Sequence, residues 1–233
     1  PVVPRRSAGH TKVVFRLTKH LHLAEYCGVS RSFKGARITC CSTGEIVYDR
    51  ALPAAVIRPV FDAVRAYPGT DIITYTDTEI LSGICPNEYT AKESAINRME
   101  VRPVDDFPTA LTFPVNKMLI PGEPDTLDVL MEQLKTQYHG LLNIYKSEPY
   151  FLEIMPQNID KAYSLRKLLG SLRLSADQMI CCGDGYNDVS MIEYAGLGVA
   201  MANAQDVVKK AADFITYSND EDGVLHVIDL FMR

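Results

Sequence analysis

Residues 179–191 read MICCGDGYNDVSM, and this stretch decides the fold. An apolar run ends at Gly183, and two carboxylates, Asp184 and Asp188, follow four residues apart before a helix-like segment begins. Glycine has no side chain to obstruct the backbone, so Gly183 and Gly185 permit a sharp bend and a close approach to a ligand. The pattern predicts a strand that ends in a tight acidic turn and leads directly into a helix.

The two carboxylates of this turn have two interpretations. Asp184 and Asp188 supply the oxygen donors that Mg²⁺ prefers, and Mg²⁺ usually takes one or two protein carboxylates beside waters and substrate phosphate. Alternatively, Asp188 caps the following helix and Gly-Asp-Gly is a plain turn. The short motif alone favours the plain turn, because short motifs match by chance. The flanking sequence reverses this preference.

The residues after the turn supply that flanking sequence. Residues 196–204 read GLGVAMANA, a second short helix-like segment follows, and residues 214–216, FIT, read as a strand. This succession resembles the C-terminal third of the haloacid dehalogenase superfamily, most closely its Cof-type sugar-phosphate phosphatases, and residues 218–224, SNDEDGV, fit the same family. The resemblance implies that the acidic turn is the family's fourth motif, which binds Mg²⁺.

Lys161, at the start of another helix-like segment, also has two interpretations. Residues 159–162, IDKA, open a segment with leucines at helical spacing. The helix macrodipole favours anions in the first turn, so Lys161 is misplaced there unless an anion lies nearby. On position alone, Lys161 reads as a solvated surface lysine. The resemblance implies instead that it belongs to the third motif, whose lysine neutralises the nucleophile and the transferring phosphate.

Different roles are expected for two asparagines, Asn187 and Asn203. Asn187 is expected to hold water or a neighbouring side chain in the site and to contact phosphate, although asparagine also stabilises tight turns. Asn203 could orient the next loop towards the cavity, but turn structure is preferred to function for this residue. The predicted site therefore has Lys161 and Asn187 as catalytic and phosphate-binding residues, and Asp184 and Asp188 as Mg²⁺ ligands.

The resembled superfamily uses a nucleophilic mechanism. An aspartate attacks the substrate phosphorus to form an aspartyl-phosphate, which water then hydrolyses, and a second aspartate two residues later serves as acid and base. Both belong to a first motif, Asp-x-Asp-Gly-Thr, at the end of the first core strand. This motif is not found in the 233 residues. The second motif, a serine or threonine, has only Thr18 as a weak candidate.

Three explanations of the missing nucleophile motif remain open. The chain is a fragment that begins after the first strand, a degenerate homologue that binds phosphometabolites without turnover, or a phosphatase whose N-terminal sequence has been altered by a reading-frame or modelling error. We favour a fragment or an altered N-terminal sequence, because the resemblance to the family fades gradually towards residue 1. Loss of a central strand would also leave an unpaired gap in a parallel sheet.

Residues 52–155 mix strands and helices without strict alternation, which indicates an α+β unit. Helices are expected at residues 53–66, 88–97 and 125–137, and strands at residues 71–75, 100–104, 117–120, 141–146 and 150–154. The resemblance places an inserted cap here, which implies an α/β, Rossmann-like core with a parallel sheet, built from residues 1–51 and 156–233. A strand is expected at residues 46–49 and another at residues 12–17, and residues 32–36, SFKGA, resemble a family turn.

Composition excludes several classes of partner. The net charge of −5 and pI near 5.6 argue against nucleic acid. No apolar run approaches the roughly 20 residues of a membrane span, so a membrane partner is not expected and P-type ion pumps, which share the fourth motif, are excluded.

Six cysteines without a Cys-x-x-Cys spacing predict reduced, buried thiols in a cytoplasmic protein. A Rossmann-like nucleotide binder would need Gly-x-Gly-x-x-Gly after its first strand. The resemblance implies a small phosphorylated metabolite as the partner, and nothing indicates the oligomeric state.

Overall fold

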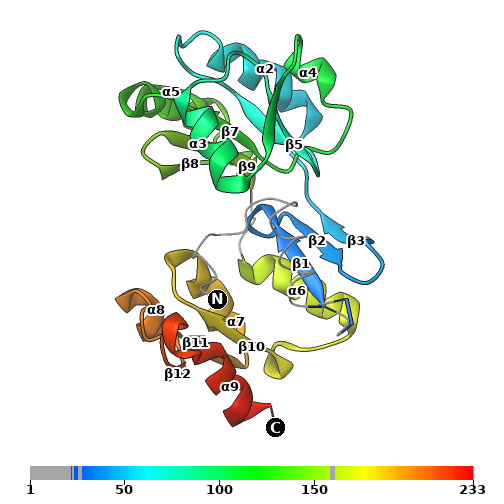
Figure 1. The fold of residues 1–233 in the computed structure, drawn as a ribbon, viewed down its shortest axis with the longest axis vertical. Coiled ribbons are helices and arrows are strands. Elements are labelled where there is room, and N and C mark those ends of the chain that lie inside the picture. The colour runs from blue at the N-terminus through cyan, green and yellow to red at the C-terminus, as the bar shows by residue number, and fades with distance from the viewer. Residues whose placement is uncertain (1–21, 23, 26–27, 158–160, 233) are drawn as a thin grey trace. The chain divides into compact units, whose positions relative to one another are not determined.

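The structure is a computed structural model that describes residues 22, 24–25, 28–157 and 161–232 (Figure 1). These residues fall into two compact units, one within Ala8–Ile159 and one within Asp160–Arg233. The strand expected at residues 12–17 and the candidate Thr18 lie outside the described residues. The expected division into a core of residues 1–51 and 156–233 around a cap of residues 52–155 stays a prediction.

The C-terminal unit contains a parallel sheet. Its described strands run in the order β10 (Ile180–Gly183), β11 (Leu197–Ala200) and β12 (Phe214–Ile215). Its helices are α6 (Lys161–Leu172), α7 (Val189–Tyr194), α8 (Asp206–Ala211) and α9 (Gly223–Phe231). Because α7 and α8 connect successive parallel strands, this unit has the βαβ pattern of an α/β fold. The predicted α/β class and parallel sheet are confirmed.

The unit within Ala8–Ile159 contains a larger, mixed sheet. In the described part its strands lie in the order β6 (Glu100–Pro103), β5 (Glu79–Ser82), β4 (Ile73–Tyr75), β7 (Met118–Pro121), β9 (Phe151–Pro156) and β8 (Leu142–Glu148). Only β5 and β6 pair in parallel, and the other neighbours are antiparallel. The structure thus has the expected α+β mixture, although the sequence did not predict β5.

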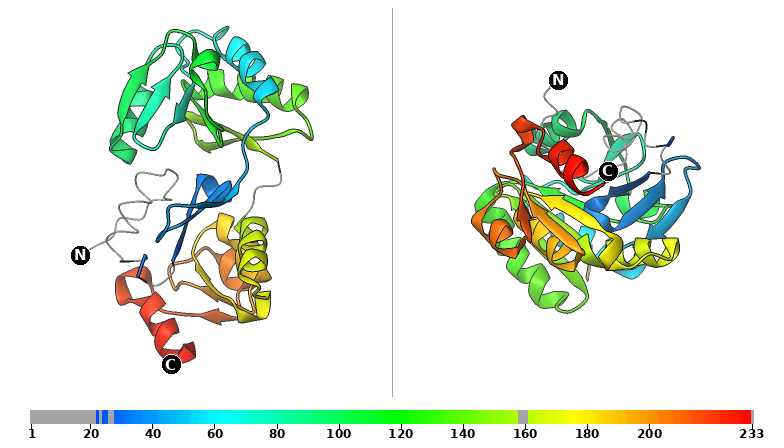
Figure 2. Two further views of the ribbon diagram at one scale, coloured as in Figure 1. Left: turned by 90° about the vertical axis from the view of Figure 1, so that its right-hand side faces the viewer. Right: turned by 90° about the horizontal axis from the view of Figure 1, so that it is seen from below.

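Helices cover this mixed sheet (Figure 2). They are α2 (Ala54–Val64), α3 (Glu88–Asn97), the short α4 (Phe107–Ala110) and α5 (Pro124–Gln137). The apolar stripes of α2 and α5 pack with buried residues of the sheet, Ile120 and Leu152 among them, in one large hydrophobic cluster. Neighbouring strand residues such as Leu119 and Phe151 belong to a second cluster, as expected when successive side chains point to opposite faces.

A buried carboxylate connects several of these elements. Asp71 has no exposed surface and accepts hydrogen bonds from the Ser82 and Thr90 hydroxyls, at 2.8 and 3.0 Å. It also accepts the backbone N–H groups of Ile72, at 2.8 Å, and Ile84, at 3.1 Å. The carboxylate therefore holds the start of β4, the end of β5 and the first turn of α3 together.

A small antiparallel sheet precedes the large one in the same unit. It consists of β1 (Val29–Ser32), β2 (Arg37–Cys40) and β3 (Ile46–Asp49), and the 3₁₀ turn η1 (Phe33–Gly35) joins the first two strands. The sequence predicted β3 and the turn at residues 32–36, but not β1 or β2. Phe33 is buried against the second hydrophobic cluster, with its ring 6.3 Å from that of Tyr75.

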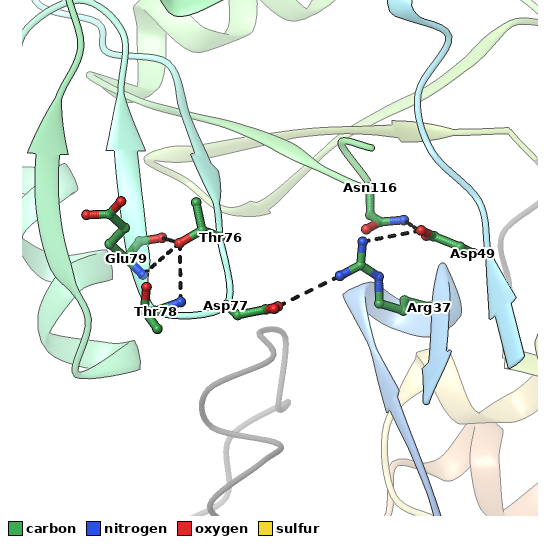
Figure 3. Close-up of polar contacts among 7 residues, drawn as sticks. All are labelled: Arg37, Asp49, Thr76, Asp77, Thr78, Glu79 and Asn116. Carbon is green, nitrogen blue, oxygen red and sulfur yellow. Dashed lines mark hydrogen bonds and ion pairs between the residues drawn. The ribbon is translucent and has the colours of Figure 1, made fainter. Parts of the chain in front are cut away.

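Polar side chains also link the small sheet to the large one (Figure 3). The Arg37 guanidinium lies 3.3 Å from the Asp49 carboxylate and 3.9 Å from that of Asp77. The Asn116 amide donates to Asp49 as well. Asp77 lies in the β4–β5 turn, where the Thr76 hydroxyl accepts two backbone N–H groups. Because the Asp77 side chain is 75% exposed, its ion pair contributes little to stability.

The cysteines in the described part of the chain are free thiols. Cys181 is buried, as expected, and burial raises the pKa of the half-buried Cys182 thiol. Cys85, between β5 and α3, is exposed, and Cys40 and Cys41 are only half-buried, so the prediction of buried thiols is wrong for Cys85 and only partly met at the other two. Among the described helices, none has both the length and the apolar content needed to span a membrane.

Candidate active site

The stretch that decided the fold forms the predicted strand, turn and helix. Strand β10 ends at Gly183, the 3₁₀ turn η3 (Tyr186–Asp188) follows, and α7 begins at the next residue. The parallel register pairs Gly183 with Ala200, and the Gly183 carbonyl accepts the N–H of Met201 at 3.0 Å. Because β10 and β11 run parallel, the loops that follow them lie at the same edge of the sheet, where open α/β sheets bind ligands.

Asp188 holds the turn together. Its side chain is buried, and Oδ2 accepts the backbone N–H groups of Asp184 and Gly185, each at 3.1 Å. Its own N–H donates to the Gly185 carbonyl at 2.8 Å. The side chain makes no capping hydrogen bond to α7, so the alternative in which Asp188 caps the following helix is wrong. The carboxylate instead closes the acidic turn on itself and brings its charge next to the Asp184 backbone.

Asp184 is held by residues of the loop after β11. Its Oδ2 accepts a hydrogen bond from the Asn203 amide at 3.3 Å, and its carbonyl accepts the N–H of Gln205 at 3.1 Å. The Asn203 amide oxygen accepts the backbone N–H of Asn219 at 2.9 Å. The sequence favoured turn structure for Asn203 over a role in orienting the next loop, and its contact with Asp184 was not predicted. No spacing in the sequence marks this contact, because it depends on β10 and β11 being neighbours in the sheet.

Gly183 gives Asp188 the space that it occupies. A Cβ at residue 183 would lie 2.5 Å from the Cβ of Asp188 and 2.8 Å from its Cγ. A Cβ at Gly185 would instead lie 2.8 Å from the end of a flexible side chain, the amide oxygen of Asn187, and at an ordinary contact distance of 3.8 Å from Oδ2 of Asp188. The close approach of Asp188 to β10 therefore requires glycine at position 183 more strictly than at position 185.

The Gly183→Ala variant is expected to displace Asp188 and to lower the free energy of unfolding by about 1–3 kcal/mol, the typical cost of overpacking. It should also weaken divalent-metal binding, because both carboxylates depend on this turn. Gly185→Ala is the matched control, since the Asn187 side chain can rotate away. Urea unfolding followed by circular dichroism, together with a Mn²⁺ titration, measures both effects. Equal behaviour of the two variants would contradict this assignment of the turn.

The structure describes the other two predicted site residues only in part. Lys161 is the first residue of α6, as expected, and its side chain lies outside what the structure describes. Asn187 is exposed in η3, and its amide oxygen lies over Gly185. The catalytic and phosphate-binding roles assigned to both residues stay predictions.

The donor set of the turn fits Mg²⁺. The two carboxylates offer oxygen donors, which hard dications prefer. In the part of the chain that the structure describes, no group of three or more His, Cys, Asp or Glu side chains is arranged to hold a metal ion. Asp184 and Asp188 thus offer one or two carboxylates, the number that Mg²⁺ usually takes from protein, and their role as Mg²⁺ ligands stays a prediction.

A parallel sheet in which one strand ends at an acidic glycine turn, with helices connecting the strands, defines an open α/β fold of the Rossmann-like class. A profile of the haloacid dehalogenase-like hydrolases matches residues 11–228, and the chain belongs to that family. The resemblance inferred from the sequence is thereby confirmed. The members of this family are enzymes, and the family supports an enzymatic function for the chain.

Individual relatives agree with this assignment. A haloacid dehalogenase-like hydrolase from Bacteroides thetaiotaomicron with a crystal structure is 41% identical, with a TM-score of 0.90 over 96% of this chain and 84% of that chain. YxeH of Bacillus subtilis, provisionally named a phosphatase, is 29% identical over 92% of this chain and 80% of its own length. YcsE of Bacillus subtilis, named 5-amino-6-(5-phospho-D-ribitylamino)uracil phosphatase, is 41% identical over 46% of this chain and 42% of its own length.

Proposed function

We propose that the protein is a Mg²⁺-dependent phosphatase that hydrolyses phosphomonoesters of small metabolites. The observation that carries this proposal is the acidic turn, in which Gly183 admits Asp188 and Asp188 holds the backbone of Asp184. Family membership and the phosphatase names of YxeH and YcsE support it. The Asp188 carboxylate is buried and that of Asp184 is half-buried, and a bound dication would offset the negative charge of both.

The residues of the site have separate proposed roles. Asp184 and Asp188 would hold Mg²⁺, which when bound offsets negative charge on the phosphoryl oxygens. Lys161, at the start of α6, would contact the transferring phosphate and neutralise part of its charge. Asn187 would orient phosphate or water from the exposed side of the turn. An aspartate nucleophile, which the resemblance implies, is not identified among the described residues.

The proposed substrates are small phosphorylated metabolites such as sugar phosphates. Support comes from the name of YcsE, whose substrate bears a phosphorylated ribityl chain. Residues 52–155 are proposed to act as a cap that selects the substrate, because caps that close over a site exclude water and contact the part of the substrate that does not react. A cytoplasmic location would give the protein access to such metabolites.

Phosphate release tests this function directly. Purified protein is incubated with para-nitrophenyl phosphate and with hexose and pentose phosphates, in Mg²⁺ or in EDTA, and inorganic phosphate is measured. We expect turnover that requires Mg²⁺ and that is faster with at least one sugar phosphate than with the aryl ester. Equal hydrolysis in EDTA would contradict the proposal.

A second candidate is a protein that binds phosphometabolites without turnover. The absence of Asp-x-Asp-Gly-Thr from the 233 residues favours it. Isothermal titration calorimetry with a non-hydrolysed phosphonate analogue, run beside the phosphate assay, separates the two functions. Binding that requires Mg²⁺ without phosphate release above the blank identifies the binding protein, whereas release identifies the phosphatase.

A further inference from the structure

Asn203 lies in the loop between β11 and α8 and contacts two other loops. Its Nδ2 donates to Oδ2 of Asp184 at 3.3 Å, and its Oδ1 accepts the backbone N–H of Asn219 at 2.9 Å. The residue is half-buried in this position. One carboxamide therefore connects the turn after β10 to the segment after β12. Its partners Asp184 and Asn219 lie 19 and 16 residues away from it in the sequence.

These contacts fix the orientation of the carboxamide. A backbone N–H is only a donor, so the group that faces Asn219 must be the amide oxygen. The amide nitrogen consequently faces Asp184, whose Oδ2 is the acceptor of this hydrogen bond. Rotating the amide by half a turn would place donor against donor at one end and acceptor against acceptor at the other. The side chain thus has one favourable orientation at Asp184.

The segment that holds Asn203 is itself well ordered by hydrogen bonds. The Ser218 hydroxyl donates to the Glu221 carboxylate at 2.6 Å, which lowers the pKa of that carboxyl, and Gly223 N–H donates to the Ser218 carbonyl at 3.0 Å. The Thr216 hydroxyl donates to the Gly223 carbonyl at 2.7 Å. These contacts fold residues 216–223 into a compact loop, so the N–H of Asn219 offers a fixed anchor for Asn203.

From this arrangement we infer that Asn203 is a positioning residue, which orients the Asp184 carboxylate for a divalent metal by anchoring it to residues 216–223. The inference rests on the proposed metal-dependent function and deepens it. Carboxylates that bind metals are themselves oriented by hydrogen bonds, and loss of such a partner typically costs about 10–100-fold in metal affinity or activity. Asn203 acts through Asp184 and does not touch the substrate in this role.

Metal affinity of the folded protein tests the inference. Asn203→Leu removes both hydrogen bonds at nearly constant size, and we expect the Mn²⁺ dissociation constant, measured by electron paramagnetic resonance, to rise roughly 10-fold. Asn219→Ala is the matched control, because it removes an amide side chain from the anchoring loop but keeps the backbone N–H that Asn203 accepts. This control should bind Mn²⁺ as the unchanged protein does.

The design separates a positioning role from a structural one. Circular dichroism and urea unfolding without metal show whether Asn203→Leu is folded, and Asn203→Ala, which adds no bulk, replaces it if it is not. A lower unfolding midpoint with unchanged Mn²⁺ affinity would overturn the inference and leave Asn203 structural. Asp184→Asn is measured in parallel. If Asp184→Asn retains full Mn²⁺ affinity, the proposed metal site itself fails. If only Asp184→Asn loses affinity, the positioning role fails and the proposed function stands.

Discussion

Asp184→Asn is expected to reduce Mg²⁺-dependent phosphate release by more than about 100-fold, beyond the usual effect of losing a residue that only supports a metal ligand. The amide keeps the size of the carboxylate and an acceptor oxygen, so the fold should be unchanged. It removes one of the two negative charges that would attract a hard dication to the turn. The rate is measured with inorganic-phosphate detection across a range of Mg²⁺ concentrations.

Two substitutions at Asp188 are compared with Asp184→Asn to separate loss of charge from loss of the turn. Asp188→Asn keeps an oxygen that can accept the N–H groups of Asp184 and Gly185, and it should lower activity without unfolding the turn. Asp188→Ala leaves both N–H groups without this acceptor and should also lower the unfolding midpoint, because an unsatisfied buried donor costs about 1–3 kcal/mol. Activity that survives both Asp184→Asn and Asp188→Asn would exclude the proposed site.

Asp71→Ala is expected to cause the largest loss of stability, about 3–5 kcal/mol for the unit within Ala8–Ile159. The substitution deprives two hydroxyls and two backbone N–H groups of the acceptor that they share in the buried interior. Urea unfolding followed by far-ultraviolet circular dichroism measures the change in the free energy of unfolding.

Asp77→Ala is the matched control for this second prediction. It makes the same chemical change in the same unit, but the Asp77 side chain is 75% exposed and its ion pair with Arg37 is 3.9 Å long. Exposed pairs of this kind contribute about 0–1 kcal/mol. A similar loss of stability in both variants would show that Asp71 has no special role in joining β4, β5 and α3.

The sequence predicted those elements whose own residues determine them. Helix α3 was expected at residues 88–97 and has these bounds. It begins there because Asn87 caps its first turn with hydrogen bonds to two N–H groups, and it ends where Arg98 adopts the left-handed conformation. Strands β1 and β2 were not predicted, since Val29–Ser32 and Arg37–Cys40 are rich in polar residues and lack a clear alternation. They form strands through pairing with each other and with β3, and tertiary pairing often overrides strand propensity.

The candidate site was predicted in its local part and missed in its long-range part. The glycine and aspartate spacing of residues 183–188 gave the strand, the turn and the candidate metal ligands. The contact of Asn203 with Asp184 depends on the parallel register in which Gly183 pairs with Ala200, which places the two following loops side by side. No spacing in the sequence encodes that register, so the partner of Asp184 became visible only in the fold.

A Mn²⁺ titration of the metal-free protein, followed by electron paramagnetic resonance, tests the central claim that the acidic turn is a divalent-metal site. We expect one Mn²⁺ ion bound per chain, displaced by added Mg²⁺, and a dissociation constant raised more than roughly 10-fold in Asp184→Asn. Circular dichroism should show that the variant is folded. Mn²⁺ binding of equal stoichiometry and affinity in the unchanged protein and in a folded Asp184→Asn variant would contradict the claim.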